Sequence, residues 1–286
     1  MRDNAFLRQR SARLGALSAV VTALLCGVLA LPVFAFASRA SGTVVVRRMA
    51  SGSATARCPS GEHVGFGGVV AGFAPPPNVP HNPEVFTEGM VRTAPDRWTV
   101  SGHSGTSGIG SRLTAVAYCE RGAVPRVVAV TEAFHAHESL AVAATCPPGT
   151  VVVGGGFKSG ATAEHIDLLV RLDRPSPSTW RAWMRNISAN ATTLTALAYC
   201  GTGAAPTPYT VTRPIGKVSY GAVGAVCPAG KSLLFGGLVA SSPGSGRHGA
   251  DLEPFTWTAP STRSWSVSAY NAGDGAGSLQ AIAYCR

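Results

Sequence analysis

The sequence predicts an all-β domain built from three homologous repeats, and three observations lead to this prediction. After residue 37 the chain holds six of its seven cysteines, and these fall into three similarly spaced pairs. The 34 glycines and 20 prolines, with 45% hydrophobic residues, are typical of many short strands joined by tight turns. Short stretches alternate between apolar and polar residues, as half-buried strands do. Long coiled coils, helical bundles and intrinsic disorder are excluded.

The first 37 residues have the features of an export signal. Four arginines precede an apolar run over residues 14–37, which ends in the small-x-small sequence Ala35-Phe36-Ala37. The run is also long enough to span a bilayer, so an uncleaved anchor is the alternative. In both cases the positive-inside rule places residues 38–286 outside the cytoplasm, secreted or in the cell envelope. Membrane contact is expected only through an uncleaved N-terminal segment.

The positive charge of the chain is scattered. The formal net charge is +10, but the basic residues are mostly single arginines and form no stripe or run. Such a distribution attracts anionic polymers without the pattern of a nucleic-acid module. We therefore expect no nucleic-acid partner.

Three repeats are predicted at about residues 43–122, 127–203 and 209–286. Each contains Cys-Pro-x-Gly, a Gly-Gly pair nine and ten positions after that cysteine, a tryptophan, and a closing Ala-Tyr-Cys. The glycine pairs are Gly67-Gly68, Gly155-Gly156 and Gly236-Gly237. The tryptophans that recur in register are Trp98, Trp180 and Trp265. This internal repetition indicates three copies of one structural unit.

The even number of cysteines in an exported chain predicts a disulfide framework. The simplest pairing has one bridge in each repeat: Cys58–Cys119, Cys146–Cys200 and Cys227–Cys285. Each bridge would contribute on the order of 4 kcal/mol through chain entropy. Bridges between neighbouring repeats are the alternative.

Each repeat is expected to hold four to five strands. An opening strand, a strand with the glycine pair, a strand that begins at the tryptophan, and a closing strand are predicted. In the first repeat these are residues 44–48, 64–70, 98–101 and 113–119. Pro-x-Gly supplies a turn, and the glycine pair indicates a bulge or a close backbone approach. One pseudo-threefold β-prism-like domain is the favoured architecture, and three separate units along the chain are the alternative.

The Cys-Pro-x-Gly and Ala-Tyr-Cys phrases resemble those of exported actinobacterial repeat proteins of unknown function. More distantly, the chain is similar to the vitelline membrane outer layer protein family, whose fold is a β-prism. The resemblance covers about residues 43–286. It departs from that family before Cys-Pro, where an aromatic residue is replaced by Arg57, Thr145 or Val226. It implies an extracellular β-prism-like protein with affinity for glycans or surface polymers.

The candidate ligand-binding residues lie where the repeats differ. Segments of unequal length between the glycine pair and the tryptophan suit recognition on a rigid scaffold, although simple exposed excursions are the alternative. Trp98, Trp180 and Trp265 recur and are predicted to be core residues. Trp183 and Trp257 have no counterparts and are predicted to be exposed aromatic contacts. The ligand-binding candidates are Trp183, Trp257, His248, Asp251, His165 and Asp167.

No catalytic residue and no cofactor is predicted. The chain has no Gly-x-Ser-x-Gly elbow, and its cysteines after residue 37 are assigned to disulfides. His135 and His137 would share one face of a strand and are the candidates for a metal site, but no third ligand is identifiable. An exposed pair is therefore the favoured interpretation.

The function expected from the sequence is non-enzymatic binding of carbohydrate or a surface polymer. The first alternative is a structural envelope or matrix protein that binds no small ligand. The second is a polysaccharide hydrolase or transglycosylase, which requires two carboxylates across the scissile bond.

Overall fold

The computed structural model describes residues 44–50, 52–72, 85–104, 112–160, 167–241 and 252–286, which form 18 strands and no helix. The predicted all-β class is therefore confirmed. Residues Ala40–Arg286 belong to one compact unit. The described part of the chain holds no helix with the length and apolarity needed to cross a bilayer. The expected export signal lies outside the described residues.

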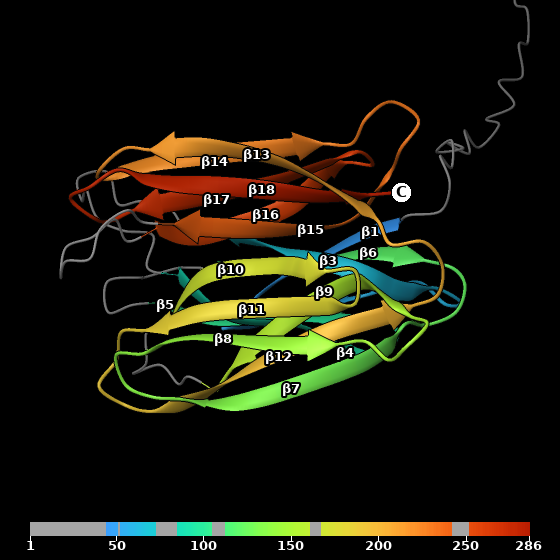
Figure 1. Cartoon of the computed structure of the whole chain (residues 1–286), viewed down its shortest axis with the longest axis horizontal. Helices are drawn as coiled ribbons and strands as arrows, with labels where there is room; N and C mark the ends of the chain where they lie inside the picture. The colour runs from blue at the N-terminus through green and yellow to red at the C-terminus, as the bar shows by residue number, and fades with distance from the viewer. Residues whose placement is uncertain (1–43, 51, 73–84, 105–111, 161–166, 242–251) are drawn as a thin grey trace, which may run out of the picture. The chain divides into compact units, whose positions relative to one another are not determined.

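The strands form three antiparallel sheets of six strands each (Figure 1). Sheet A contains, in order, β1 (Val44–Ala50), β6 (Arg112–Glu120), β3 (His63–Gly72), β16 (Leu252–Ser261), β17 (Ser264–Asn271) and β14 (Ser219–Val226). Sheet B contains β2 (Ser53–Arg57), β5 (Arg97–Ser104), β4 (Val85–Ala94), β9 (Val151–Ser159), β12 (Thr192–Gly201) and β7 (Arg126–Phe134). Sheet C contains β13 (Thr207–Ile215), β18 (Gly277–Cys285), β15 (Leu233–Ser241), β10 (Asp167–Ser176), β11 (Thr179–Asn186) and β8 (Ser139–Thr145).

Every sheet is shared by two repeats. Each repeat places its opening, closing and glycine-pair strands in one sheet and its other three strands in the next. Repeats 1 and 3 thus build sheet A, repeats 1 and 2 build sheet B, and repeats 2 and 3 build sheet C. The alternative of three separate units is therefore wrong.

Each repeat has six strands, so the expectation of four to five was too low. The missed strands precede Cys-Pro or lie between the glycine pair and the tryptophan. The strands between the glycine pair and the tryptophan are β4, β10 and β16. Each contains a register shift against the neighbouring strand, at Glu88, Val170 and Phe255 respectively. A bulge residue interrupts the period-two alternation on which recognition of a strand depends.

The predicted disulfides Cys58–Cys119, Cys146–Cys200 and Cys227–Cys285 are all present, with Cα–Cα distances of 5.6, 5.6 and 5.7 Å. In each pair the first cysteine directly follows a strand of one sheet, and the second belongs to the closing strand, in the other sheet. Each bridge therefore joins the two sheets to which its repeat contributes.

The glycine pairs permit two close approaches, as predicted. A Cβ atom on the first glycine of each pair would lie about 2 Å from the indole of its own repeat: Gly67 and Trp98, Gly155 and Trp180, Gly236 and Trp265. A Cβ on the second glycine would lie 2.3–2.5 Å from a carbonyl oxygen of a neighbouring repeat: Gly68 and Trp257, Gly156 and Met90, Gly237 and Leu172. The three tryptophans are at most 1% exposed, which confirms their predicted core role.

The closing-strand tyrosines hold neighbouring repeats together. Each phenol oxygen accepts a hydrogen bond from a backbone N–H of another repeat. The pairs are Arg92 to Tyr199 at 2.7 Å, Arg174 to Tyr284 at 2.8 Å and Ala259 to Tyr118 at 2.5 Å. Direct strand pairing between repeats involves only two residue pairs at each junction. The tyrosine hydrogen bonds therefore add to a short interface between the repeats.

Candidate functional site

The three repeats meet around a hollow of about 400 Å³. The residue that follows the closing cysteine lines it in every repeat, and these residues are Glu120, Gly201 and Arg286. Val153 and Leu234 add apolar walls, and Thr150 adds a hydroxyl group. The volume lies in the range of small-molecule sites.

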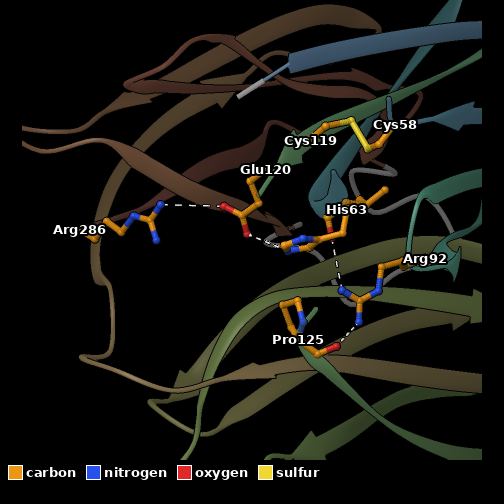
Figure 2. A network of polar contacts seen from close by, with 8 residues as sticks. Cys58, His63, Arg92, Cys119, Glu120, Pro125 and Arg286 are labelled. Carbon is orange, nitrogen blue, oxygen red and sulfur yellow. Dashed lines mark hydrogen bonds and ion pairs between the residues drawn. A yellow bond between two sulfur atoms is a disulfide. The ribbon is translucent and has the colours of Figure 1, made fainter. Parts of the chain in front are cut away.

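Charged groups beside this hollow are paired with one another (Figure 2). The Glu120 carboxylate lies 3.5 Å from Nε2 of His63 and, on its other side, 3.9 Å from Nη2 of Arg286. Gly65 makes this possible, because a Cβ there would lie 2.7 Å from Oε1 of Glu120. The network therefore connects repeat 3 to repeat 1.

The buried Arg92 and the partly buried Arg174 have the same structural character. Arg92 donates hydrogen bonds to the carbonyls of Val64 and Pro125, and its guanidinium carbon lies 4.6 Å from the ring centre of Tyr199. Arg174 bonds the carbonyl of Pro206 in the equivalent way, whereas repeat 3 has Ala259 at this position. Desolvation lowers the pKa of Arg92, and the electrostatic effects of Tyr199 and Glu120 offset part of this change. The side chains of Arg92 and Arg174 thus bond the segment that precedes the next repeat.

The outer face of sheet C carries a more exposed group of side chains, here called the sheet C cluster: Arg171, Asp173, Arg181 and Trp183. Trp183 faces outward because its neighbours in β11, Ala182 and Met184, are fully buried. Arg171 pairs with Trp183 across the sheet, and its guanidinium carbon lies 5.5 Å from the ring centre. Trp183 is half-buried, so part of the indole remains accessible.

A planar ion pair completes the sheet C cluster. Arg181 donates two hydrogen bonds to Asp173, from Nε at 2.9 Å and from Nη2 at 2.8 Å. The bonds to this carboxylate raise the pKa of Arg181. Arg171 Nη1 lies 3.8 Å from the same carboxylate. On the edge strand β8 the small residues Ala141 and Ala143 face Trp183 and Arg181, which leaves the cluster open on that side.

The chemistry of the sheet C cluster suits a sugar. The C–H face of a pyranose packs on an indole, which has a large rigid apolar surface. The hydroxyl groups around the ring pair with guanidinium and carboxylate edges, where charge-assisted hydrogen bonds are strong. A single carboxylate that is already held by two arginines is poorly placed for acid–base catalysis.

The structure places Trp257 in the core, so the prediction of an exposed contact is wrong. Its side chain is 1% exposed, and the indole nitrogen donates to Sδ of Met90 at 2.9 Å. Met90 and Leu172 occupy the equivalent inward positions of the other repeats and are also buried. Trp257 lacked a counterpart in the sequence because these three core positions hold different residue types.

His165, His248 and Asp251 lie outside the described residues, and Asp167 is described only by its backbone, which pairs with Asn186. Trp183 is therefore the one ligand-binding candidate whose side chain is described on an outer face. The sequence did not single out Arg171, Asp173 and Arg181. Their signal was the alternation of charged residues with apolar ones around Trp183.

His135 and His137 lie in the turn between β7 and β8, so the prediction that they share a strand face is wrong. His137 has a φ of 58°, and the Glu138 carboxylate accepts the backbone N–H of His135 at 2.8 Å. This turn reverses the chain between two sheets. Among the described residues no group of three His, Cys, Asp or Glu side chains is placed to hold a metal ion.

Comparisons with known proteins add no identity. No protein-family model matches the chain. No curated protein matches it either.

Proposed function

We propose that the chain is a non-enzymatic, extracellular carbohydrate-binding module whose contact site is the sheet C cluster. The observation that carries the proposal is the half-buried Trp183 beside a planar Arg181–Asp173 pair on an outer sheet face. A preformed aromatic surface with fixed polar edges binds at low entropic cost. Recognition by such a group needs no cofactor.

The ligand class follows from the charges of the site. Asp173 contacts both Arg171 and Arg181, so the sheet C cluster has one more positive than negative charge. Sugars with a carboxylate or another anionic substituent would gain from this excess, and the net charge of the whole chain favours anionic polymers in the same way. We therefore propose an acidic glycan of a cell surface or wall as the ligand.

The proposed location and architecture have independent support. Three disulfides are typical of proteins in oxidising compartments, and residues 1–37 have the composition of an export signal. Three sheets that are each shared by two repeats favour a β-prism-like arrangement. We retain the relationship to the vitelline membrane outer layer family as part of this proposal, on its sequence phrases.

Binding to immobilised acidic polysaccharides, such as polygalacturonate and a cell-wall uronic acid polymer, tests the proposal. Trp183→Ala is expected to weaken binding about tenfold or more, because the stacking surface is lost. Trp183→Phe should retain most of it. The control Thr55→Ala, on the outer face of sheet B, should bind as the unmodified chain does.

Three results would contradict this function. Equal binding by Trp183→Ala and the unmodified chain would show that the sheet C cluster is not the binding site. Self-association with no bound glycan would favour a structural envelope protein. Release of shortened oligosaccharides during the assay would favour the hydrolase alternative.

A further inference from the structure

A second aromatic group lies on the outer face of sheet A, here called the sheet A cluster: Tyr220, Phe255 and Tyr270. The Tyr220 ring centre lies 4.7 Å from that of Tyr270, with the planes tilted by 42°. The Phe255 ring meets Tyr220 edge-on at 6.2 Å and 80°. Tyr220 is 54% exposed, so contacts with two rings orient a side chain that remains open to solvent.

The strands explain why these three rings meet on the outer side of sheet A. Tyr220 and Tyr270 are paired across β14 and β17 and therefore share a face. Val267 and Ala269 occupy the inward positions of β17 and are fully buried, so Tyr270 points the other way, where neighbouring side chains leave only 5% of it exposed. Phe255 is the bulge residue of β16. Phe255 thus corresponds to the bulge residues Glu88 and Val170 of the other repeats, which supply no aromatic ring.

Small hydroxyl side chains extend along the same face from the sheet A cluster. The outward positions next to it hold six small or hydroxylated residues, here called the sheet A shelf: Ala222, Gly224, Thr256, Thr258, Ser266 and Ser268. From Tyr270 to Ser266 the strand advances about 13 Å. None of the six carries a charge.

The sheet A shelf occupies the positions that hold the sheet C cluster in the preceding repeat. Counted from the core tryptophans Trp180 and Trp265, Ser266 corresponds to Arg181 and Ser268 to Trp183. Counted from the inward residues Leu172 and Trp257 at the junctions between repeats, Thr256 corresponds to Arg171 and Thr258 to Asp173. One structural position is therefore charged in sheet C and neutral in sheet A. A neutral shelf avoids the desolvation of ions and offers hydroxyl groups to hydroxyl groups.

We infer that the sheet A cluster and shelf form a second carbohydrate site, which takes uncharged pyranose units of a polysaccharide. The exposed ring of Tyr220 and the partly exposed ring of Phe255 stack against one sugar, and the shelf hydroxyls contact the units that follow. The buried ring of Tyr270 supports Tyr220 from behind. This inference rests on the proposed function, because it gives one chain two glycan sites of different charge preference on two sheets. Burial, followed by Tyr270 and Glu253, raises the pKa of Tyr220, so its phenol stays a hydrogen-bond donor at neutral pH.

A panel of immobilised neutral oligosaccharides tests the second site: cellohexaose, laminarihexaose, mannohexaose and chitohexaose. At least one should bind the unmodified chain, and Tyr220→Ala should weaken that binding about tenfold or more. Tyr220→Phe should keep it within a few-fold, because the ring remains. Trp183→Ala and the control Thr55→Ala should leave it unchanged. The unfolding temperature of Tyr220→Ala should match that of the unmodified chain, since the side chain is exposed.

Binding at both sites should also link two glycans. Beads that carry the neutral oligosaccharide and beads that carry the acidic polysaccharide should co-aggregate with the unmodified chain, and either Tyr220→Ala or Trp183→Ala should abolish this. Acidic binding lost in Trp183→Ala, with no neutral binding, would overturn the second site and leave the proposed function standing. Neutral binding that Trp183→Ala abolishes and Tyr220→Ala does not would assign both ligands to sheet C. Absence of all glycan binding would overturn both.

Discussion

Two glycines side by side in each repeat serve different contacts. The first leaves room for the indole of its own repeat, and the second leaves room for a carbonyl of another repeat. The indole nitrogen also donates to the carbonyl of the second glycine, at 3.3, 3.1 and 3.0 Å in the three repeats. The short Gly-Gly phrase therefore links folding of one repeat to its assembly with the next.

Gly155→Ala is expected to lower the free energy of unfolding by about 3 kcal/mol or more, because the added Cβ would overlap the Trp180 ring in a packed core. Gly149→Ala, in the Pro-x-Gly turn, should cost only about 1 kcal/mol. Its φ is +77° but nothing lies within 4 Å of the added atom. Urea denaturation of both variants measures the difference, and equal losses would contradict the packing argument.

Tyr199 makes stability depend on alkaline pH. Burial raises the pKa of its phenol to about 12, and the N–H donated by Arg92 offsets only part of this effect. Below pH 10 the phenol is protonated in both the folded and the unfolded chain, so stability is unaffected. Between pH 10 and 12 the unfolded chain releases this proton and the folded chain retains it, so stability falls by about 3 kcal/mol.

Tyr199→Phe should remove the loss of stability that Tyr199 causes between pH 10 and 12. At neutral pH the same substitution should cost about 1–3 kcal/mol, because the N–H of Arg92 loses its acceptor in a buried place. The measurement is the urea-unfolding free energy at pH 8 and pH 12. A pH slope identical to that of the unmodified chain would show that Tyr199 ionises freely in the folded state.

At the scale of strands, the junctions between repeats are short and are reinforced by side chains. At the junction of repeats 1 and 2, β4 pairs with β9 through two residues, and Arg92 adds bonds to the carbonyls of Val64 and Pro125. Pro125 directly precedes β7, so Arg92 also fixes the start of repeat 2. The junction of repeats 3 and 1 has Ala259 at the position of Arg92 and the Glu120–Arg286 ion pair instead.

Arg92→Met is expected to lower the free energy of unfolding by about 2–3 kcal/mol, since two carbonyl oxygens lose a charged donor while the apolar volume is kept. Arg97→Met is the matched control. The Arg97 side chain is 51% exposed and only approaches Asp96 at 3.8 Å, so its loss should change little. Thermal unfolding compares the stabilities of the two variants. Equal destabilisation by Arg97→Met and Arg92→Met would refute the stabilising role of the Arg92 hydrogen bonds.

The repetition of phrases was enough to predict the disulfides, the turns and the core tryptophans, since each depends on residues that recur. The strands β4, β10 and β16 were missed because bulges at Glu88, Val170 and Phe255 break their alternation. The charged neighbours of Trp183 were missed for a different reason. Arg171 lies opposite Trp183, and Asp173 lies opposite Arg181, because the bulge at Val170 shifts the pairing register by one residue.

At the scale of the molecule, the covalent and non-covalent connections have different roles. Each disulfide closes one repeat across two sheets, whereas the sheets themselves connect different repeats. The chain links repeat 1 to 2 and repeat 2 to 3, whereas in the described part of the chain repeats 3 and 1 are joined by the pairing of β16 with β3 and by side-chain contacts such as Trp257 with Met90. A scaffold of this kind holds outer sheet faces in fixed positions, as the two proposed glycan sites require.

The most direct test of this architecture is non-reducing peptide mapping of a double variant, Val70→Cys with Thr256→Cys. These two residues are partners across the β3–β16 junction, far apart in the sequence. We expect the three bridges Cys58–Cys119, Cys146–Cys200 and Cys227–Cys285, together with one new link between peptides that contain positions 70 and 256. Free thiols at the two introduced positions, or native cysteines joined between repeats, would contradict it.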